Sequence, residues 1–181
     1  MKAVETGISG LLILEPRVFE DDRGFFMESY NNRVFSELTG LTPDFVQDNH
    51  SRSSRNVLRG IHYQIKQPQG KLVRVTSGSV FDVAVDLRKS SPTFGRWFGV
   101  ELTADNHRQF WVPAGFGHGF LVLSEQADFL YKTTDYYAPE HERCIKWDDP
   151  GIGIDWPAVG APVVSAKDQQ GISLQNAEVF P

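Results

Sequence analysis

The chain has 181 residues, a length that suits one domain spanning residues 1–181. Its 18 Lys and Arg residues and 23 Asp and Glu residues give a formal net charge of −5, which argues against a surface devoted to nucleic acid or to an anionic membrane. The single cysteine, Cys144, excludes an intramolecular disulfide and a cysteine-based zinc site. The sequence lacks a signal-peptide pattern and a long apolar run, so we expect a cytoplasmic protein without membrane contact.

The first predicted element is a helix over residues 32–40. Asn32 is expected to cap its N-terminus, and Gly40 is expected to end it. Val34, Phe35 and Leu38 recur at helical spacing and would form its apolar stripe.

Most of the remaining chain is predicted to form short strands. Between residues 81 and 87, apolar side chains alternate with Asp82, Ala84 and Asp86, the period of a half-buried strand. Ser77-Gly78 lies between this segment and residues 72–76 and is typical of a hairpin turn. Further strands are expected over residues 98–102, 109–112, 120–123 and 128–133. Such a series indicates an all-β barrel or double-sheet jelly roll, and from about Pro139 we expect loops and short helices packed on it.

Two stretches place histidines in strongly patterned surroundings. One is Arg59-Gly60-Ile61-His62-Tyr63-Gln64, and the other runs from Pro113 to Phe120 and contains His118. Its Pro-x-Gly-x-x-His pattern resembles the second motif of the cupin superfamily, whose metal-binding members add a His-x-His pair and a carboxylate. Gln64 stands where the second histidine of that pair would lie, so we expect no metal. Two core histidines remain the alternative.

Without a metal, His62 is a candidate general base, because histidine accepts and returns a proton near neutral pH. It would need an orienting carboxylate, which the residues alone do not identify. Tyr131 shares a strand face with Phe129 and Thr133 and is either a core tyrosine or the acid on the far side of a substrate. No Walker or dinucleotide-binding glycine pattern is present, so a phosphate would be held by side chains. Three cations near these motifs are either solvated or anion-binding: Arg23, Arg59 and Lys71.

Taken together, seven ordered motifs resemble the dTDP-4-dehydrorhamnose 3,5-epimerase family over nearly the whole chain, from about residue 3 to about residue 175. The motifs are residues 19–26, 47–51, 58–64, 69–73, 113–120, 130–132 and 165–168. The resemblance implies a mainly β, metal-free, cupin-like jelly roll (double-stranded β-helix) with a few short helices and no cofactor. It also implies a homodimer with exchanged N-terminal strands and a dTDP-sugar substrate.

The resemblance further implies roles for single residues. His62 would be the base paired with Asp168, Tyr131 would move the proton on the opposite face, and Lys71 would lie by the C4 carbonyl oxygen. Arg59 and His118 would hold the sugar and diphosphate. Five further residues of the family's nucleotide-sugar site are Arg23, Phe26, Glu28, Gln47 and Asn49. Tyr137 would stack on the thymine, although the adjacent Tyr136 could take that place, and Glu142 would be another contact.

The expected reaction is epimerisation at C3 and C5 of dTDP-4-dehydro-6-deoxy-D-glucose, because a 4-keto group acidifies both C–H bonds. The product would be dTDP-4-dehydro-L-rhamnose, for cell-wall or O-antigen rhamnose. Three alternatives stay open: a relative that inverts a single centre, a metal-dependent cupin enzyme using His62 and His118, and a non-catalytic sugar-binding cupin.

Overall fold

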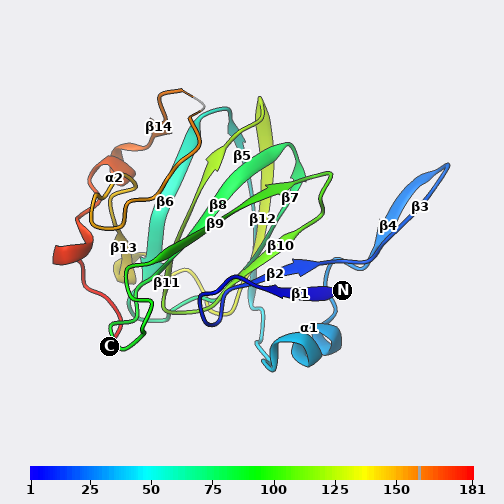
Figure 1. The fold of residues 1–181 in the computed structure, drawn as a ribbon, viewed down its shortest axis with the longest axis horizontal. Helices are drawn as coiled ribbons and strands as arrows, with labels where there is room; N and C mark the ends of the chain where they lie inside the picture. The colour runs from blue at the N-terminus through cyan, green and yellow to red at the C-terminus, as the bar shows by residue number, and fades with distance from the viewer. Residues whose placement is uncertain (159) are drawn as a thin grey trace.

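Two six-stranded sheets form the body of the computed structural model, which describes residues 1–158 and 160–181 (Figure 1). The first sheet has the order β1 (Lys2–Glu5), β2 (Leu12–Glu15), β10 (Gln109–Val112), β7 (Lys71–Ser77), β12 (Gln126–Thr133), β5 (Gln47–Ser54). The second has the order β13 (Glu142–Cys144), β6 (Val57–Gln64), β11 (Phe116–Val122), β8 (Ser79–Asp86), β9 (Trp97–Thr103), and β14 (Val163–Val164) pairs in parallel with β6. The predicted mainly β, cupin-like jelly roll is confirmed.

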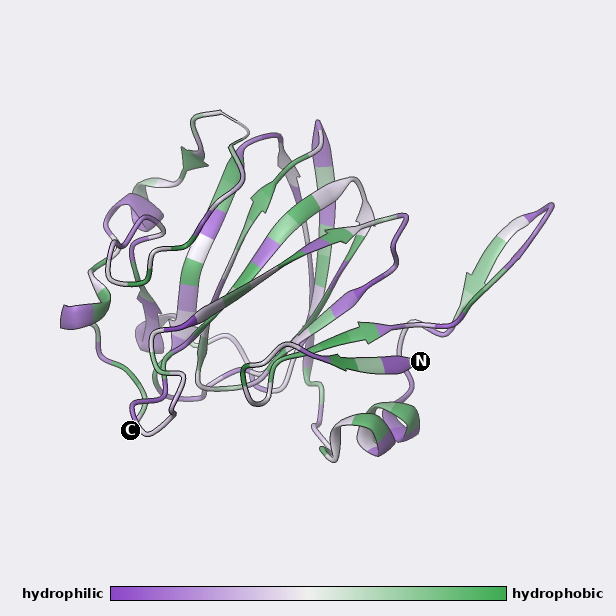
Figure 2. Cartoon of the chain, viewed as in Figure 1, coloured by the Kyte–Doolittle hydropathy of each residue, from purple (hydrophilic) through white to green (hydrophobic). Residues whose placement is uncertain are grey.

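The main core fills the space between the two sheets. Phe110, Phe129 and Val73 come from the first sheet, and Val80 and Val122 come from the second; all five are at most 1% exposed. Full burial of one such side chain contributes roughly 1.5–3 kcal/mol. Apolar residues gather along these central strands in Figure 2. The prediction of a half-buried strand over residues 81–87 is wrong, because both faces of β8 are buried: Ala84 faces this core, Val83 and Val85 face a second one, and Asp82 is 0% exposed.

The outer face of the second sheet is covered by the C-terminal segment. Ile145 and Ile152 pack there against Ile61, Val83 and Val85, which are buried. Three short helices belong to this segment: η1 (Pro139–His141), α2 (Ala166–Gln169) and η2 (Leu174–Asn176). This confirms the expectation of loops and short helices packed on the barrel, and it brings α2 beside β6.

The early helix, α1 (Asn32–Thr39), forms where the sequence predicts it, but its cap is one residue earlier. Asn31, not Asn32, accepts the backbone N–H of Val34 through its side chain, at 3.2 Å. Asn31 has the extended backbone that a cap requires, whereas Asn32 is already helical. Gly40 ends the helix with a φ of 70°. Phe35 is the buried residue of α1 and meets the Trp111 ring edge-on at 5.2 Å.

The hairpin predicted at Ser77-Gly78 is wrong. The strands before and after it lie in different sheets, because β7 pairs with β10 and β12, while β8 pairs with β9 and β11. Gly78, with a φ of 75°, carries the chain across the core from one sheet to the other. A short Gly-containing turn fits both connections, so the local pattern could not tell them apart.

This crossing predicts a stability effect at Gly78. A Cβ there would lie 2.0 Å from the backbone oxygen of Gln126, in a left-handed conformation, so we expect Gly78→Ala to cost about 2–4 kcal/mol. Gly7→Ala is the matched control, since Gly7 has a φ of 81° and open space around it; its expected cost is about 1 kcal/mol. Urea unfolding of both variants measures the difference, and equal costs would contradict the steric argument.

An N-terminal hairpin projects away from the two sheets (Figure 1). It consists of β3 (Val18–Asp21) and β4 (Gly24–Met27), which pair with each other in a separate two-stranded sheet. Phe19, Phe25 and Phe26 on it are at least half exposed. Within residues 1–158 and 160–181, no helix combines the length and apolar character that crossing a membrane requires.

Candidate active site

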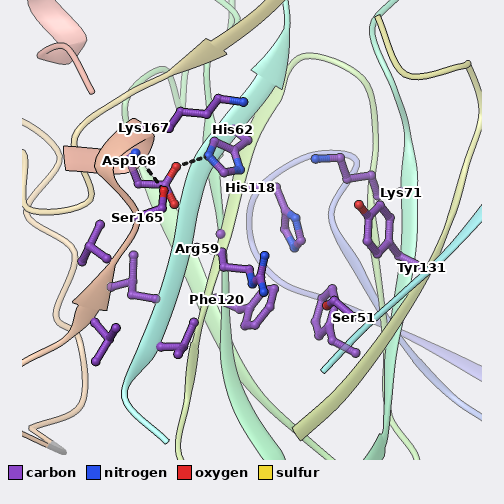
Figure 3. Close-up of a pocket in the computed structure, with 16 residues that line it drawn as sticks. Ser51, Arg59, His62, Lys71, His118, Phe120, Tyr131, Ser165, Lys167 and Asp168 are labelled. Atoms are coloured by element: carbon purple, nitrogen blue, oxygen red, sulfur yellow. Dashed lines mark hydrogen bonds and ion pairs between the residues drawn. The ribbon is translucent and has the colours of Figure 1, made fainter. Parts of the chain in front are cut away.

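A cavity of about 500 Å³ is lined by strands of both sheets and by the segment around α2. Six residues predicted from the sequence line it: Arg59, His62, Lys71, His118, Tyr131 and Asp168. In Figure 3, His62 and Asp168 lie on one side, Lys71 and Tyr131 lie on the other, and His118 lies between them. The fold therefore brings together side chains that are far apart in the sequence.

A histidine–aspartate pair forms one wall of the cavity. Nε2 of His62, on β6, lies 2.5 Å from Oδ1 of Asp168, which is 3% exposed. Ser165 caps α2 by accepting the backbone N–H of Asp168 at 3.1 Å, and this fixes where the carboxylate lies. Burial alone would raise the pKa of Asp168, but the hydrogen bond and charge of His62 outweigh it and lower that pKa.

The ionised state of Asp168 sets the proton position on His62. A carboxylate is an acceptor, so the Nε2 atom facing it carries the hydrogen. Nδ1 is then unprotonated in the neutral ring, and Figure 3 shows this second nitrogen on the cavity side. The pair thus presents a basic nitrogen to the cavity while Asp168 stabilises the cation that forms after proton uptake.

The opposite wall carries an acid and a cation. Burial raises the pKa of Tyr131, against the opposing charge of Arg59, so its phenol is a neutral donor at pH 7. Burial lowers the pKa of Lys71 to about 8, while Asp82 and Glu142 favour its charged form. Lys71 is therefore mostly a cation at neutral pH, yet its proton is more easily lost than that of a solvated lysine.

Four predicted contacts form a hydrogen-bonded chain beside the cavity. Gln47 donates to Asn49 at 3.0 Å and accepts the backbone N–H of Tyr137 at 3.0 Å. The Tyr137 hydroxyl donates to Glu142 at 2.8 Å. Glu142 also accepts from Lys167, which lines the cavity. Tyr137 is the tyrosine held in this chain by its side chain, while Tyr136 contributes its backbone carbonyl to Gln64.

Three predicted contacts lie outside the cavity within a single chain. Arg23 and Phe26 line a separate depression on the projecting hairpin, where Arg23 pairs with Asp21 at 2.5 Å. Glu28 follows the hairpin and is exposed. Within one chain, these three residues therefore do not join the residues that line the cavity.

Sequence reasoning missed four residues at this site: Ser51, Asp82, Cys144 and Lys167. Ser51 lines the cavity from β5. The only signal for Lys167 was its position next to Asp168. The alternating pattern set Asp82 on the polar face of its strand and gave no sign of its burial, yet it is 0% exposed and accepts from His118 at 2.9 Å. Cys144 lies 4.0 Å from Asp168, because β13 pairs with β6 and places Cys144 opposite His62.

His62, Cys144 and Asp168 also form a group of three donors within 4.8 Å of one another, which a divalent cation could use. The donor set fits such an ion poorly. Burial raises the pKa of the Cys144 thiol to about 12, whereas a metal ligand must be a thiolate. Asp168 already uses Oδ1 to accept from His62. The expectation of a metal-free site stays a prediction.

Comparisons of the sequence and the structure with known proteins identify the family. The family model described as dTDP-4-dehydrorhamnose 3,5-epimerase matches residues 5–176. A relative of that name from Pseudomonas aeruginosa is 64% identical over 181 residues and covers 100% of both chains. This chain belongs to the dTDP-4-dehydrorhamnose 3,5-epimerase family. It is an isomerase, and the family inferred from the seven motifs is confirmed.

Other members of the epimerase family support the same assignment. One from Salmonella typhimurium is 57% identical over 178 residues, covering 98% of this chain and 97% of the relative. The crystal structure of an epimerase from Legionella pneumophila in complex with dTDP-4-keto-L-rhamnose is 53% identical, with a TM-score of 0.96. It covers 98% of this chain and 94% of that chain. The double-sheet architecture of this epimerase is therefore that of the family.

Proposed function

We propose that this epimerase inverts C3 and C5 of dTDP-4-dehydro-6-deoxy-D-glucose to give dTDP-4-dehydro-L-rhamnose, in dTDP-L-rhamnose biosynthesis. His62 is the base, Tyr131 is the acid on the opposite face, and Lys71 stabilises the enolate. The observation that carries the proposal is the 2.5 Å His62–Asp168 pair facing Tyr131 across one cavity.

The chemistry needs an acidic C–H bond, which the 4-keto group supplies at both neighbouring carbons. Nδ1 of His62 takes the proton, and the electron pair of the broken C–H bond delocalises onto the C4 oxygen. Lys71 beside that oxygen favours the enolate over the ketone, and such differential stabilisation lowers the barrier. Tyr131 then gives its proton to the other face of the carbon, which inverts the centre. Proton exchange with solvent resets both groups for the second carbon.

Substrate binding is assigned to the cations and the aromatic group around the cavity. Arg59 and His118 line it and hold the sugar and diphosphate. A guanidinium binds a diphosphate through a planar pair of N–H groups, which suits Arg59 to that role. Lys167 adds a charge at the rim. Tyr137 stacks on the thymine, and Glu142 orients Tyr137 through their 2.8 Å hydrogen bond.

Deuterium wash-in tests the reaction. Incubating the enzyme with dTDP-4-dehydro-6-deoxy-D-glucose in D₂O should place deuterium at both C3 and C5, measured by proton NMR and mass spectrometry. Stable deuterium at one carbon alone would instead establish a single-centre epimerase. Absence of wash-in at both carbons, with substrate bound, would indicate a sugar-binding protein.

We also propose that the enzyme is a homodimer in which each projecting hairpin completes the partner's site. Its exposed aromatic residues Phe25 and Phe26 support this, because isolated exposed aromatic clusters are unusual on a monomer. Arg23 on the same hairpin would bring a cation to a cavity that binds a dianion. The two sheets interleave along the chain, with strands between residues 2 and 133 in the first and between residues 57 and 164 in the second, which supports a single domain over residues 1–181. The cytoplasmic location stays a prediction.

Strand exchange predicts complementation between two defective variants. Arg23→Ala and His62→Asn, each impaired alone, should regain activity when the two chains are produced together. In a mixed dimer one of the two sites receives both an intact His62 and an intact Arg23, so about half of the sites of the purified mixed dimer recover. Steady-state rates of the purified mixed dimer measure this. Activity no higher than the mean of the parents would contradict the exchange.

A further inference from the structure

Residues 135–138, between β12 and η1, carry Tyr137 without any regular secondary structure. Tyr137 is half exposed, so packing alone does not fix its ring. Backbone groups in such a segment have no strand or helix ladder to pair with, and they need partners from elsewhere. Three glutamine side chains supply several of these partners.

Gln64 holds the backbone on both sides of Tyr137. It lies on β6, is 4% exposed, and its Nε2 atom donates to the backbone oxygens of Tyr136 at 3.2 Å and of Gln67 at 2.7 Å. Its Oε1 atom accepts the backbone N–H of Ala138 at 2.9 Å. Both amide donors and the acceptor oxygen are therefore engaged with backbone groups. A buried amide used in this way supports a segment of chain rather than contacting a substrate.

Two further glutamines hold the same segment. Gln47, on β5, accepts the backbone N–H of Tyr137 at 3.0 Å. Gln69, which lies just before β7, donates to the backbone oxygen of Asp135 at 2.8 Å. The segment is thereby held from β5 of the first sheet, from β6 of the second sheet and from the loop between β6 and β7.

The far end of the Tyr137 side chain is held as well. Its hydroxyl donates to Glu142 at 2.8 Å, and Glu142 accepts from Lys167, which lines the cavity. The backbone and the hydroxyl of Tyr137 are thus both fixed, while the residue remains 52% exposed. An aromatic ring that is fixed at both ends and still exposed is suited to stacking on a planar group.

We propose that Gln64, assisted by Gln69, is a positioning residue that fixes Tyr137 beside the cavity before the nucleotide binds. The inference deepens the proposed function and rests on it, because it takes Tyr137 as the residue that stacks on the thymine. Gln64 itself contacts neither the base nor the sugar. Ordering a side chain during binding costs affinity, so a ring that is ordered in advance binds the base more tightly.

The test is the affinity of Gln64→Met for dTDP, measured by calorimetry. Methionine keeps the length of the side chain but removes all three hydrogen bonds. The Kd of dTDP and the KM of dTDP-4-dehydro-6-deoxy-D-glucose should rise about fivefold, because the ring must then be ordered during binding. At saturating substrate, kcat should stay within about twofold of wild type, since His62 and Tyr131 keep their places.

A second substitution shows whether Gln64 acts through Tyr137. Tyr137→Ala alone should raise the Kd of dTDP about tenfold, which corresponds to the loss of one stack between an aromatic ring and a base. Adding Gln64→Met to Tyr137→Ala should raise that Kd by less than about twofold more, because no ring is left to position. A general weakening of the fold would instead add the same factor in both backgrounds.

Asp149→Leu is the matched control. Asp149 is 4% exposed, like Gln64, and its carboxylate also holds irregular segments by their backbone. It accepts the N–H groups of Gly151, Ile152 and Leu174 at 2.7, 3.3 and 2.9 Å, but it does not line the cavity. This variant should unfold at a lower urea concentration, while the Kd of dTDP and the KM stay those of wild type.

Gln69→Met, at a less buried position, provides the test if Gln64→Met does not fold. Its expected rise in the Kd of dTDP is about threefold, and this rise should also vanish in the Tyr137→Ala background. An unchanged Kd in the folded variant, or the same loss with and without Tyr137, would overturn the inference. A wild-type enzyme that fails to bind dTDP, or a Tyr137→Ala variant that binds it like wild type, would overturn the proposed nucleotide site and the inference with it.

Discussion

Replacing His62 by Asn is expected to lower kcat by about 10²–10⁴-fold and to abolish deuterium wash-in at both C3 and C5. One base serves both carbons in the proposed mechanism, so neither exchange survives its loss. Asn is chosen because its amide can still donate to the buried Asp168, which would otherwise lose its 2.5 Å partner. Binding of dTDP, measured by calorimetry, should change little, since the nucleotide is assigned to other residues.

His50→Asn is the matched control for this variant. His50 also lies beside an aspartate, with Nε2 3.2 Å from Asp128, but neither residue lines the cavity. It should keep wild-type rates and full wash-in at both carbons. Residual wash-in at one carbon in His62→Asn would show that a second base serves that centre, which would contradict the single-base mechanism.

The sequence was sufficient to predict the fold class and the main part of the site, for a physical reason. Alternating side chains and turn residues are local signals, so the strands and the early helix follow from short stretches of chain. The motifs around His62 and Lys71 are also local. The contact between His62 and Asp168 spans 106 positions, and it was predicted through the family resemblance rather than from the residues themselves.

Contacts that arise from the pairing and packing of strands could not be predicted from the sequence. The connection at Gly78 was predicted to be a hairpin, because glycine suits both a tight turn within one sheet and a crossing between two sheets. Cys144 lies beside the His62–Asp168 pair because β13 pairs with β6, and His118 lies beside Asp82 because β11 pairs with β8. Such relations depend on the register and layering of strands, which no local pattern encodes.

Proton removal and inversion are expected to depend on opposite walls of the cavity. In Tyr131→Phe, His62 still removes a proton and Lys71 still faces the enolate, but the opposite face has lost its donor. The returning proton then comes from His62 itself. Product formation should fall by about 10²–10⁴-fold, while unreacted substrate in D₂O still acquires deuterium with its configuration retained.

This outcome would assign the two faces independently. His62→Asn would stop deuterium exchange, whereas Tyr131→Phe would stop inversion and leave deuterium exchange in place. Removing a hydroxyl from a side chain packed against Phe129 leaves the ring contacts in place, so the variant should fold normally. Phe129→Leu is a suitable control, since it alters packing on the same strand without removing a proton donor. Equal loss of exchange and inversion in Tyr131→Phe would mean that Tyr131 supports the enolate rather than delivering the proton, and the acid would then have to be sought among the other groups at the cavity.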